Sequence, residues 1–204
     1  VEADLESAYL DEANLRDANL KEAILRGTDM RYADLHGATL RDADLEGANL
    51  EQAVLVKTNA NSANLRMAIL YHADLDEADF RDTRLNRAVF IGARGSHTIF
   101  TNSDLSEIYA PKASLRQAQL NGTNLEAANF VGADLSGSTF RDVNLAGARI
   151  TQARLVDVEV DAYVDRLVVN GVDVTDFVNQ HDPWYPLRAQ IEADDLDGLR
   201  EALT

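Results

Sequence analysis

The sequence predicts an all-β solenoid over residues 1–160, a chain wound into four-sided coils with one side for every five residues. Leu, Phe, Met, Ile or Val stands at almost every fifth position, and only Ala60, Gly95 and Ala110 are small among these 32 positions. Ala stands two residues earlier in 22 of the 32 repeats. A period of five fits neither a helix of 3.6 residues per turn nor the alternation of a strand, so the chain must turn at each repeat.

Four sides make a coil of 20 residues, and residues 1–160 make about eight coils. The large residue and the small one two places before it point inward, and the other three point outward. Residues 20 apart then become neighbours: the column that starts at Leu5 is leucine in every coil as far as Leu145. Ala60 stands one coil before Phe80. A small residue next to a large one keeps the volume of a packed core constant.

The tail, residues 161–204, leaves this period and is predicted to form a hairpin and helices that cap the open end of the solenoid. Asn170-Gly171 between β-branched residues is typical of a two-residue hairpin turn. Thr175 is placed to N-cap a short helix that ends near Gln180. A last helix is expected at 194–203.

The unit Ala-(Asp/Asn)-Leu-x-x resembles the repeat of the pentapeptide-repeat family, and the match covers about four fifths of the chain without a break in register. The resemblance implies a right-handed quadrilateral parallel β-helix. Residues 167–178 are also similar to the connector of actinobacterial proteins in which a DinB-like helical domain follows the repeats. Val1, already inside a repeat, indicates a piece of a longer protein.

Charge and composition limit the possible partners. The net charge is −16, so the basic surface that attracts nucleic-acid phosphates is missing. The chain has no cysteine, no apolar run near the roughly 20 residues of a membrane helix, and no signal-peptide pattern. We therefore expect a bacterial, cytoplasmic protein without membrane contact, whose partner is another protein or a second copy.

The sequence shows no motif of catalysis. The four histidines are scattered, and no nucleophile-elbow, Walker or dinucleotide-binding pattern is present. Most Asp residues stand just before the large inward residue, where a short polar side chain can bond the backbone of the turn. We therefore predict no catalytic residue, no metal or cofactor site, and no small-molecule substrate.

The acidic surface suggests an alternative function. Some members of the family that this chain resembles protect DNA gyrase by mimicking duplex DNA, which requires a face of continuous negative charge. Here the sign alternates from coil to coil, as in Asp44 and Arg66, and such charges neutralise one another. A compact acidic patch, the secondary candidate surface, consists of Asp74, Asp76, Glu77 and Asp79.

An apolar stripe is the main candidate site. Outward positions are mostly polar, but on one face they are apolar in successive coils. The stripe consists of Met67, Ile69, Tyr71, Val89, Ile91, Tyr109, Pro111 and Val131. A band of this size indicates a docking site for a protein partner or a second copy. The alternatives are that the tail folds over it, or that these residues favour strands and have no further role.

These observations favour a non-catalytic interaction or scaffold module, and the sequence does not identify its partner. Two alternatives stay open. One is a modulator or protector of DNA gyrase or topoisomerase, and the other is the N-terminal arm of a DinB-like fusion enzyme.

Overall fold

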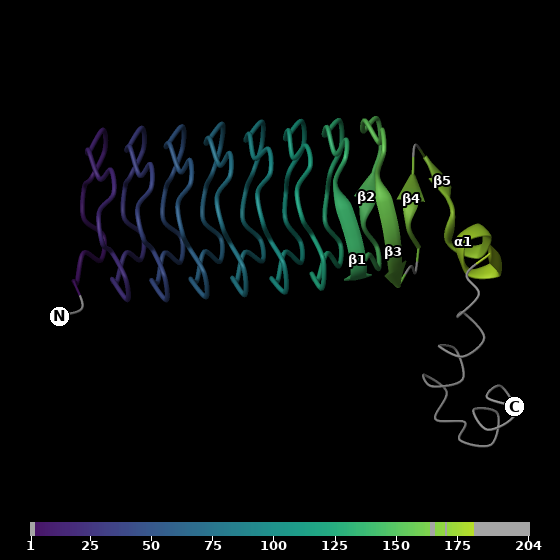
Figure 1. Cartoon of the computed structure of the whole chain (residues 1–204), viewed down its shortest axis with the longest axis horizontal. Helices are drawn as coiled ribbons and strands as arrows, with labels where there is room; N and C mark the ends of the chain where they lie inside the picture. The colour runs from purple at the N-terminus through teal and green to yellow at the C-terminus, as the bar shows by residue number, and fades with distance from the viewer. Residues whose placement is uncertain (1–2, 164–165, 170, 182–204) are drawn as a thin grey trace, which may run out of the picture.

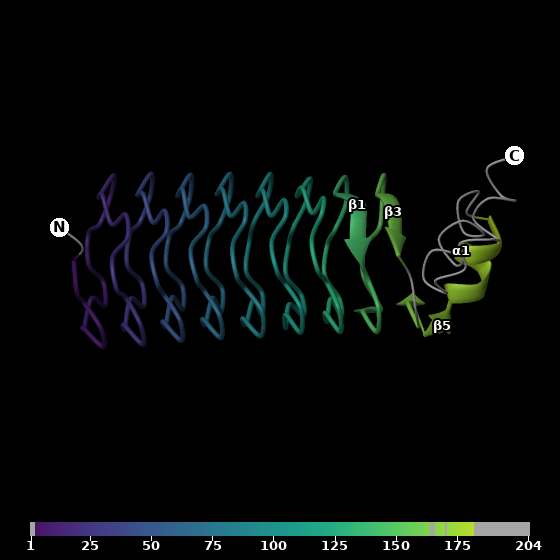
Figure 2. The same cartoon turned by 90° about the horizontal axis from the view of Figure 1, so that it is seen from below.

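The chain forms a rod of stacked coils (Figure 1). The computed structural model describes residues 3–163, 166–169 and 171–181. The described chain advances from the N-terminal coil to a hairpin and a short helix at the opposite end, and a view turned by 90° shows the same stack (Figure 2). The predicted solenoid is confirmed, while its handedness and the number of its coils stay predictions.

Each coil takes 20 residues and pairs in parallel with the next. The pairs run from Asp4↔Ile24 to Asp134↔Arg154, with one pair for every five residues. Ile24 N donates to Ala3 O at 2.9 Å on one side of the coil, and Leu5 N donates to Ile24 O at 2.8 Å. This ladder satisfies the backbone donors and acceptors that the rod would otherwise bury unpaired.

A tight turn makes each corner of the coil. In the first described corner Ala8 N donates to Leu5 O at 3.0 Å, and Ser7 has a φ of 56°. Every fifth residue from Ser7 to Asp157 has a positive φ, and most of these residues are not glycine. A left-handed residue other than glycine costs about 1 kcal/mol. The ladder and the inward side chains on either side of the corner offset that cost.

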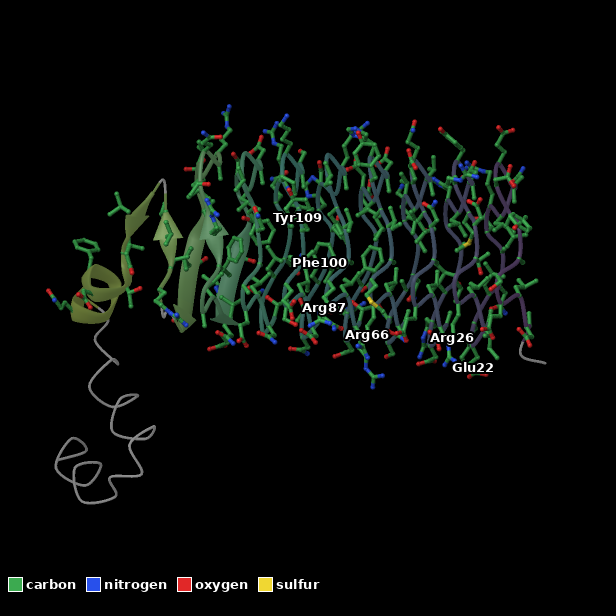
Figure 3. All side chains as sticks on the ribbon, turned by 180° about the vertical axis from the view of Figure 1, so that it is seen from behind. Glu22, Arg26, Arg66, Arg87, Phe100 and Tyr109 are labelled. Carbon is green, nitrogen blue, oxygen red and sulfur yellow. The ribbon has the colours of Figure 1, made fainter. Side chains whose placement is uncertain are left out.

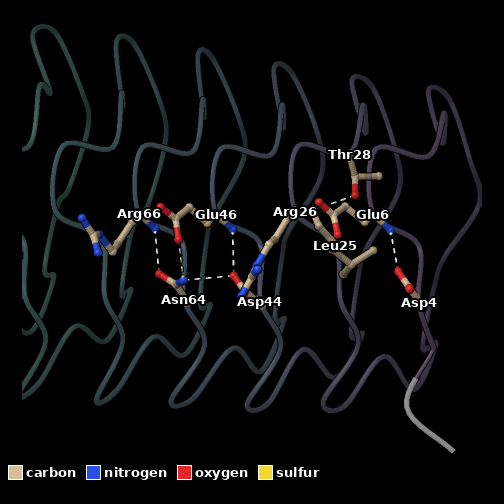
Figure 4. Close-up of polar contacts among 9 residues, drawn as sticks. All are labelled: Asp4, Glu6, Leu25, Arg26, Thr28, Asp44, Glu46, Asn64 and Arg66. Atoms are coloured by element: carbon tan, nitrogen blue, oxygen red, sulfur yellow. Dashed lines mark hydrogen bonds and ion pairs between the residues drawn. The ribbon is translucent and has the colours of Figure 1, made fainter.

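Asp or Asn at the outward position secures the corner that follows it. The side-chain oxygen accepts from the backbone N–H two residues later, as from Glu46 N to Asp44 Oδ1 at 3.2 Å (Figure 4). The same bond joins Glu6 N to Asp4 Oδ1 at 3.1 Å and recurs along the rod. The predicted structural role of these polar residues is thereby confirmed.

The inward side chains form one continuous core. The all-leucine column is buried from Leu25 to Leu145. Phe80 and Phe100 stack in successive coils, with ring centroids 5.5 Å apart and planes 11° apart. Ala60 is fully buried one coil before Phe80, so the predicted neighbour relation between a small and a large residue holds.

Hydroxyl side chains replace Ala at several small inward positions and are paired there. Thr58 Oγ1 donates to Leu35 O at 2.8 Å, and Ser103 Oγ donates to Phe80 O at 2.6 Å. Each makes a bond to a backbone carbonyl, so it can be buried without a desolvated, unpaired hydroxyl. The full set is Thr28, Thr58, Thr83, Thr98, Ser103, Thr123 and Ser138.

The register of 20 ends at the C-terminal end of the rod. β1 (Thr139–Asn144) pairs in parallel with β3 (Glu159–Tyr163), and the pairing shifts by one residue between Arg141 and Val143. β2 (Arg149–Ile150) then pairs with β4 (Val168–Val169), which lies 19 residues later. The final winding is therefore one residue shorter than a coil.

β4 turns back into β5 (Val172–Asp173) as an antiparallel pair, and α1 (Thr175–His181) follows. The predicted hairpin and short helix are confirmed, although Asn170 lies outside the described residues. The predicted N-cap role of Thr175 stays a prediction; its Oγ1 accepts from Leu167 N at 3.1 Å and ties the start of α1 to the preceding strand. The helix expected at 194–203 lies outside the described residues, and the capping role of the tail stays a prediction.

Candidate functional site

The centre of the apolar stripe is a column on one face of the solenoid. Ile69 pairs with Val89, and Val89 pairs with Tyr109. Ile69 is 39% exposed and Tyr109 is 44% exposed, while Val89 is half-buried. Asn49 and Asn129 continue the column in the coils on either side. The apolar run is therefore bounded by polar residues at both ends.

A second apolar column borders the first, at the corner that follows it. Backbone bonds keep this column in line from coil to coil, for example from His72 N to Ile91 O at 3.0 Å. Met67, 44% exposed, lies at the corner that precedes Ile69. The second column consists of the half-buried residues Tyr71, Ile91, Pro111 and Val131. The structure thus brings all eight stripe residues onto adjoining positions, and what they bind stays a prediction.

Two residues outside the predicted stripe fix the position of Tyr71. The ring of His72 contacts Tyr71 edge-on, with centroids 4.1 Å apart and planes at 63°. His72 Nδ1 lies 3.3 Å from Gly92 O. Gly92 has a φ of +63°, and a Cβ there would lie 2.5 Å from the His72 ring. A glycine one coil after a histidine at the same corner position was the available sequence signal, and sequence reasoning missed it.

Two residues of the stripe cannot accept the hydrogen bond from the backbone of the turn that Asn accepts at the same position in neighbouring coils. Asn49 and Asn129 each accept from the backbone N–H two residues later, at 3.1 Å. Ile69 and Val89 occupy the same position in the coils between them and have no side-chain oxygen. A bond of this kind contributes about 1 kcal/mol. The corners after Ile69 and Val89 therefore lack a bond that the corners after Asn49 and Asn129 have.

Every carboxylate of the acidic patch has a cationic partner. The ion pairs connect different coils, except that of Asp79, whose partner is two residues away. Pairs of this kind near the surface are individually weak but cancel the local charge. The partners are Arg94 for Asp74 at 3.7 Å and Asp76 at 3.2 Å, Lys57 for Glu77 at 3.7 Å, and Arg81 for Asp79.

The face that starts at Asp4 carries Asp4 and Glu6 in the first coil and Asp44 and Glu46 two coils later, and it also has paired charges. Arg26 Nε donates to Asp44 Oδ2 at 2.5 Å, and Asn64 Nδ2 bridges Asp44 and Glu46 at 2.9 and 3.3 Å (Figure 4). Arg26 and Arg66 lie along one edge of the rod, where basic and acidic side chains are interspersed (Figure 3). This edge therefore lacks the continuous negative charge of a DNA duplex.

A family model covers most of the solenoid. The model of the pentapeptide repeats matches residues 1–37, 33–70, 73–117 and 118–157, in eight copies. This chain belongs to the pentapeptide-repeat family. The resemblance seen in the repeat unit is confirmed, whereas the likeness of the tail to a DinB connector stays a prediction. No curated protein matches the sequence.

Solved structures of other pentapeptide-repeat proteins are similar to this one. A trypsin-treated variant of QnrB1, a plasmid-mediated fluoroquinolone resistance protein, is 21% identical, with 78% of this chain and 90% of that chain covered and a TM-score of 0.54. HetL, involved in heterocyst differentiation regulation in the cyanobacterium Nostoc sp. strain PCC 7120, is 28% identical, with coverage of 82% and 85% and a TM-score of 0.37. A protein of the Arabidopsis thaliana thylakoid lumen is 30% identical, with coverage of 45% and 67% and a TM-score of 0.38. The match to QnrB1 shows a shared fold.

Metal-ligating side chains do not gather in the part of this pentapeptide-repeat chain that the structure describes. That part holds no group of three or more His, Asp or Glu residues able to bind a metal ion. His36, His72 and His97 stand at corners of different coils, and the side chain of His181 is outside the described set.

None of the described helices is long and apolar enough to cross a membrane.

The ion pair between Asp79 and Arg81 makes part of the stability of the fold depend on pH. Partial burial acts to raise the pKa of Asp79, but hydrogen bonds from the side chain and backbone of Arg81 outweigh burial and hold this pKa below its usual value. A carboxylate whose pKa is lower in the folded state stabilises the fold above its unfolded pKa, about 3.9 for Asp. That stabilisation is lost as the pH falls through the folded-state pKa.

Replacing Asp79 with Asn should lower the melting temperature at about pH 7 and lower it by a smaller amount at about pH 3, below the unfolded pKa of about 3.9. Asn removes the charge but can keep the turn bond, as Asn59 does one coil earlier with Asn61 N at 3.2 Å. Thermal unfolding followed by circular dichroism across this range measures the difference. An equal loss of stability at both pH values would contradict a role for the carboxylate charge.

Proposed function

We propose that this protein is a non-catalytic protein-interaction module and that the apolar stripe is its docking face. One observation carries the proposal: Ile69, Val89 and Tyr109 form a continuous apolar ladder where neighbouring coils place Asn. These residues stay partly exposed, and Ile69 and Val89 have no side-chain oxygen to accept the backbone hydrogen bond that Asn accepts at that position. A partner that buries them would offset the loss.

The stripe has the composition of an interface centre. Tyr71 and Tyr109 are the aromatic residues that most often dominate binding energy, and the contact with His72 holds Tyr71 in place before a partner arrives. Polar residues border the stripe and would form the rim, among them the Arg87–Glu107 ion pair, whose closest atoms are 3.1 Å apart. Over four coils at strand spacing the stripe is about 15 Å long, so flanking residues must complete a stable interface.

The position of the described tail argues against the tail-packing alternative for residues 166–169 and 171–181. β4, β5 and α1 lie beyond the last coils, at the end of the rod (Figures 1 and 2). Tyr109 is labelled in the middle region of the rod, well before that end (Figure 3). These elements therefore leave the stripe open to another molecule.

Protection of DNA gyrase is less well supported than docking through the stripe. The similarity to QnrB1 at 21% identity concerns the fold alone. Ion pairs offset most of the charge of the acidic patch, and Asp44 on the face that starts at Asp4 is paired with Arg26, which opposes mimicry of DNA. The arm of a DinB-like fusion enzyme also remains an alternative, and the gene sequence after Thr204 tests it.

A double substitution separates docking from a structural role of the stripe. In Ile69→Asn/Val89→Asn, each new side chain can accept the turn bond that Asn49 and Asn129 make in the same column. We therefore expect an unchanged or higher melting temperature, together with at least tenfold weaker association with a second copy or with the cognate protein. Sedimentation velocity measures self-association, and cross-linking followed by mass spectrometry identifies contacts of Tyr71 and Tyr109.

The matched control is Ile99→Asn, which makes the same exchange at the equivalent position of another face. It should change the melting temperature in the same direction and leave association intact. If the double variant binds as the unaltered protein does, or if it is strongly destabilised, the stripe is ordinary strand surface. A gyrase supercoiling assay with a fluoroquinolone, run on the same variants, tests the alternative function.

A further inference from the structure

Two arginines without a partner line one pocket on the face that starts at Asp4. The pocket is an open hollow of about 520 Å³, and Arg66 and Arg84 both lie in its wall. Neither guanidinium forms a hydrogen bond or an ion pair with a residue that the structure describes. The Nε atom of Arg66 is also buried. Because buried polar atoms almost always have a hydrogen-bond partner, this nitrogen indicates a contact that the described chain does not supply.

The same two positions hold an ion pair two coils earlier. Arg26 and Asp44 stand 40 residues before Arg66 and Arg84, at the same two places of the coil. There Arg26 Nε donates to Asp44 Oδ2 at 2.5 Å. In the later coils an arginine takes the position of Asp44, so Arg66 Nε lacks the acceptor that Arg26 Nε has. Pairs with the same spacing of 18 residues recur along the rod, in Arg16–Asp34 at 2.9 Å and Arg141–Glu159 at 2.8 Å.

The nearest carboxylates of the preceding coil do not replace this acceptor. The side chain of Arg66 points away from Glu46 and towards the following coil (Figure 4). Arg84 belongs to that following coil, since it pairs with Asn64. Glu46 and Asp44 instead accept from Asn64 Nδ2, at 3.3 and 2.9 Å. The acceptor for Arg66 must therefore come from another molecule.

We propose that Arg66 and Arg84 form a binding site for the carboxylate of an Asp or Glu side chain on another protein molecule. A carboxylate matches the geometry of a guanidinium, and the fold already uses this pairing at the equivalent place. Glu46 and Asp82 line the same pocket, and their negative charge disfavours a doubly charged phosphate more than a carboxylate. Arg66 directly precedes Met67 of the apolar stripe. The source of the carboxylate thus rests on the proposed docking face, whereas the site itself does not.

Acetate is the probe for this site, and nuclear magnetic resonance of the arginine Nε–H groups follows its binding. In an isotope-labelled full chain at constant ionic strength, acetate should shift the Arg66 signal in a saturable way. The Arg26 signal should stay in place, because Asp44 already occupies it. Arg84→Gln should weaken acetate binding about tenfold, since one of two charged donors is removed. The matched control is Arg149→Gln: Arg149 is also exposed and also precedes an inward residue, but it does not line the pocket, so binding should not change.

A second variant supplies the missing carboxylate within the chain. Arg84→Asp restores the pattern of the earlier coils and should abolish the response of the Arg66 signal to acetate. An Arg66 signal that does not move, equal movement of the Arg26 signal, or tighter binding of inorganic phosphate than of acetate would overturn the proposal. A shift of the Arg66 signal with protein concentration would support it and identify a second copy as the source. Ile69→Asn/Val89→Asn should keep the acetate response, so a failure of docking through the stripe and a failure of this site are told apart.

Discussion

Changing Leu65 to aspartate is expected to unfold the middle of the solenoid. Leu65 is completely buried in the all-leucine column between Leu45 and Leu85, where a carboxylate would have no cation to pair with. The cost of several kcal/mol for an unpaired buried charge approaches the whole stability of an ordinary domain, about 5–15 kcal/mol. Because each coil is stabilised by its neighbours, the loss should spread to the adjacent coils.

Ser62→Asp is the control for this prediction. It adds the same charge three residues away at an exposed corner position, and the same corner column already holds Asp42 and Asp82 in the neighbouring coils. Circular dichroism melting and limited proteolysis should show loss of the central coils for Leu65→Asp and almost no change for Ser62→Asp. Similar melting of both variants would show that the inward column tolerates charge, against the packing described here.

Changing Ala60 to phenylalanine is expected to destabilise the protein by about 1–3 kcal/mol through overpacking. Phe80 and Phe100 already stack in the next two coils, so a third ring in the same column has no free volume. Adding Phe80→Ala should relieve part of that strain. The two substitutions together are then less harmful than the sum of their separate effects, with a coupling of about 0.5–3 kcal/mol.

Urea unfolding of the four proteins in this cycle measures the coupling. Phe130→Ala provides the control partner, because Phe130 lies in a different inward column and more than three coils away from Ala60. Ala60→Phe and Phe130→Ala should therefore be additive. Additivity in both pairs would mean that Ala60 and Phe80 do not share space in the core.

The five-residue period alone allowed several features of this structure to be predicted. Because a turn is required at each repeat, the period fixes which residues point inward, which corners are tight and which residues lie 20 apart. The all-leucine column, the proximity of Ala60 to Phe80 and the bonds from Asp and Asn to the corner backbone follow from that local rule. They hold because the ladder repeats the same geometry in every coil.

The apolar stripe could be predicted only in part. Its columns follow from the 20-residue repeat, but the fixed position of Tyr71 depends on how His72 lies over Gly92. The acidic patch depends similarly on side-chain direction. Arg94 reaches back to Asp76, 18 residues earlier, and so offsets part of the negative charge that the sequence suggested.

At the C-terminal end of the rod the five-residue period no longer predicts the strand register, and tertiary contacts determine it. The sequence determined that a hairpin and a short helix follow the solenoid. Only the structure showed that the pairing slips after Arg141, that Thr175 holds Leu167, and that Leu155 and Val160 are left partly exposed. The physical reason is that a period defines local turns and stacking between equivalent residues, whereas the last winding has no equivalent coil above it. Its register is set by contacts among residues that occur once in the chain.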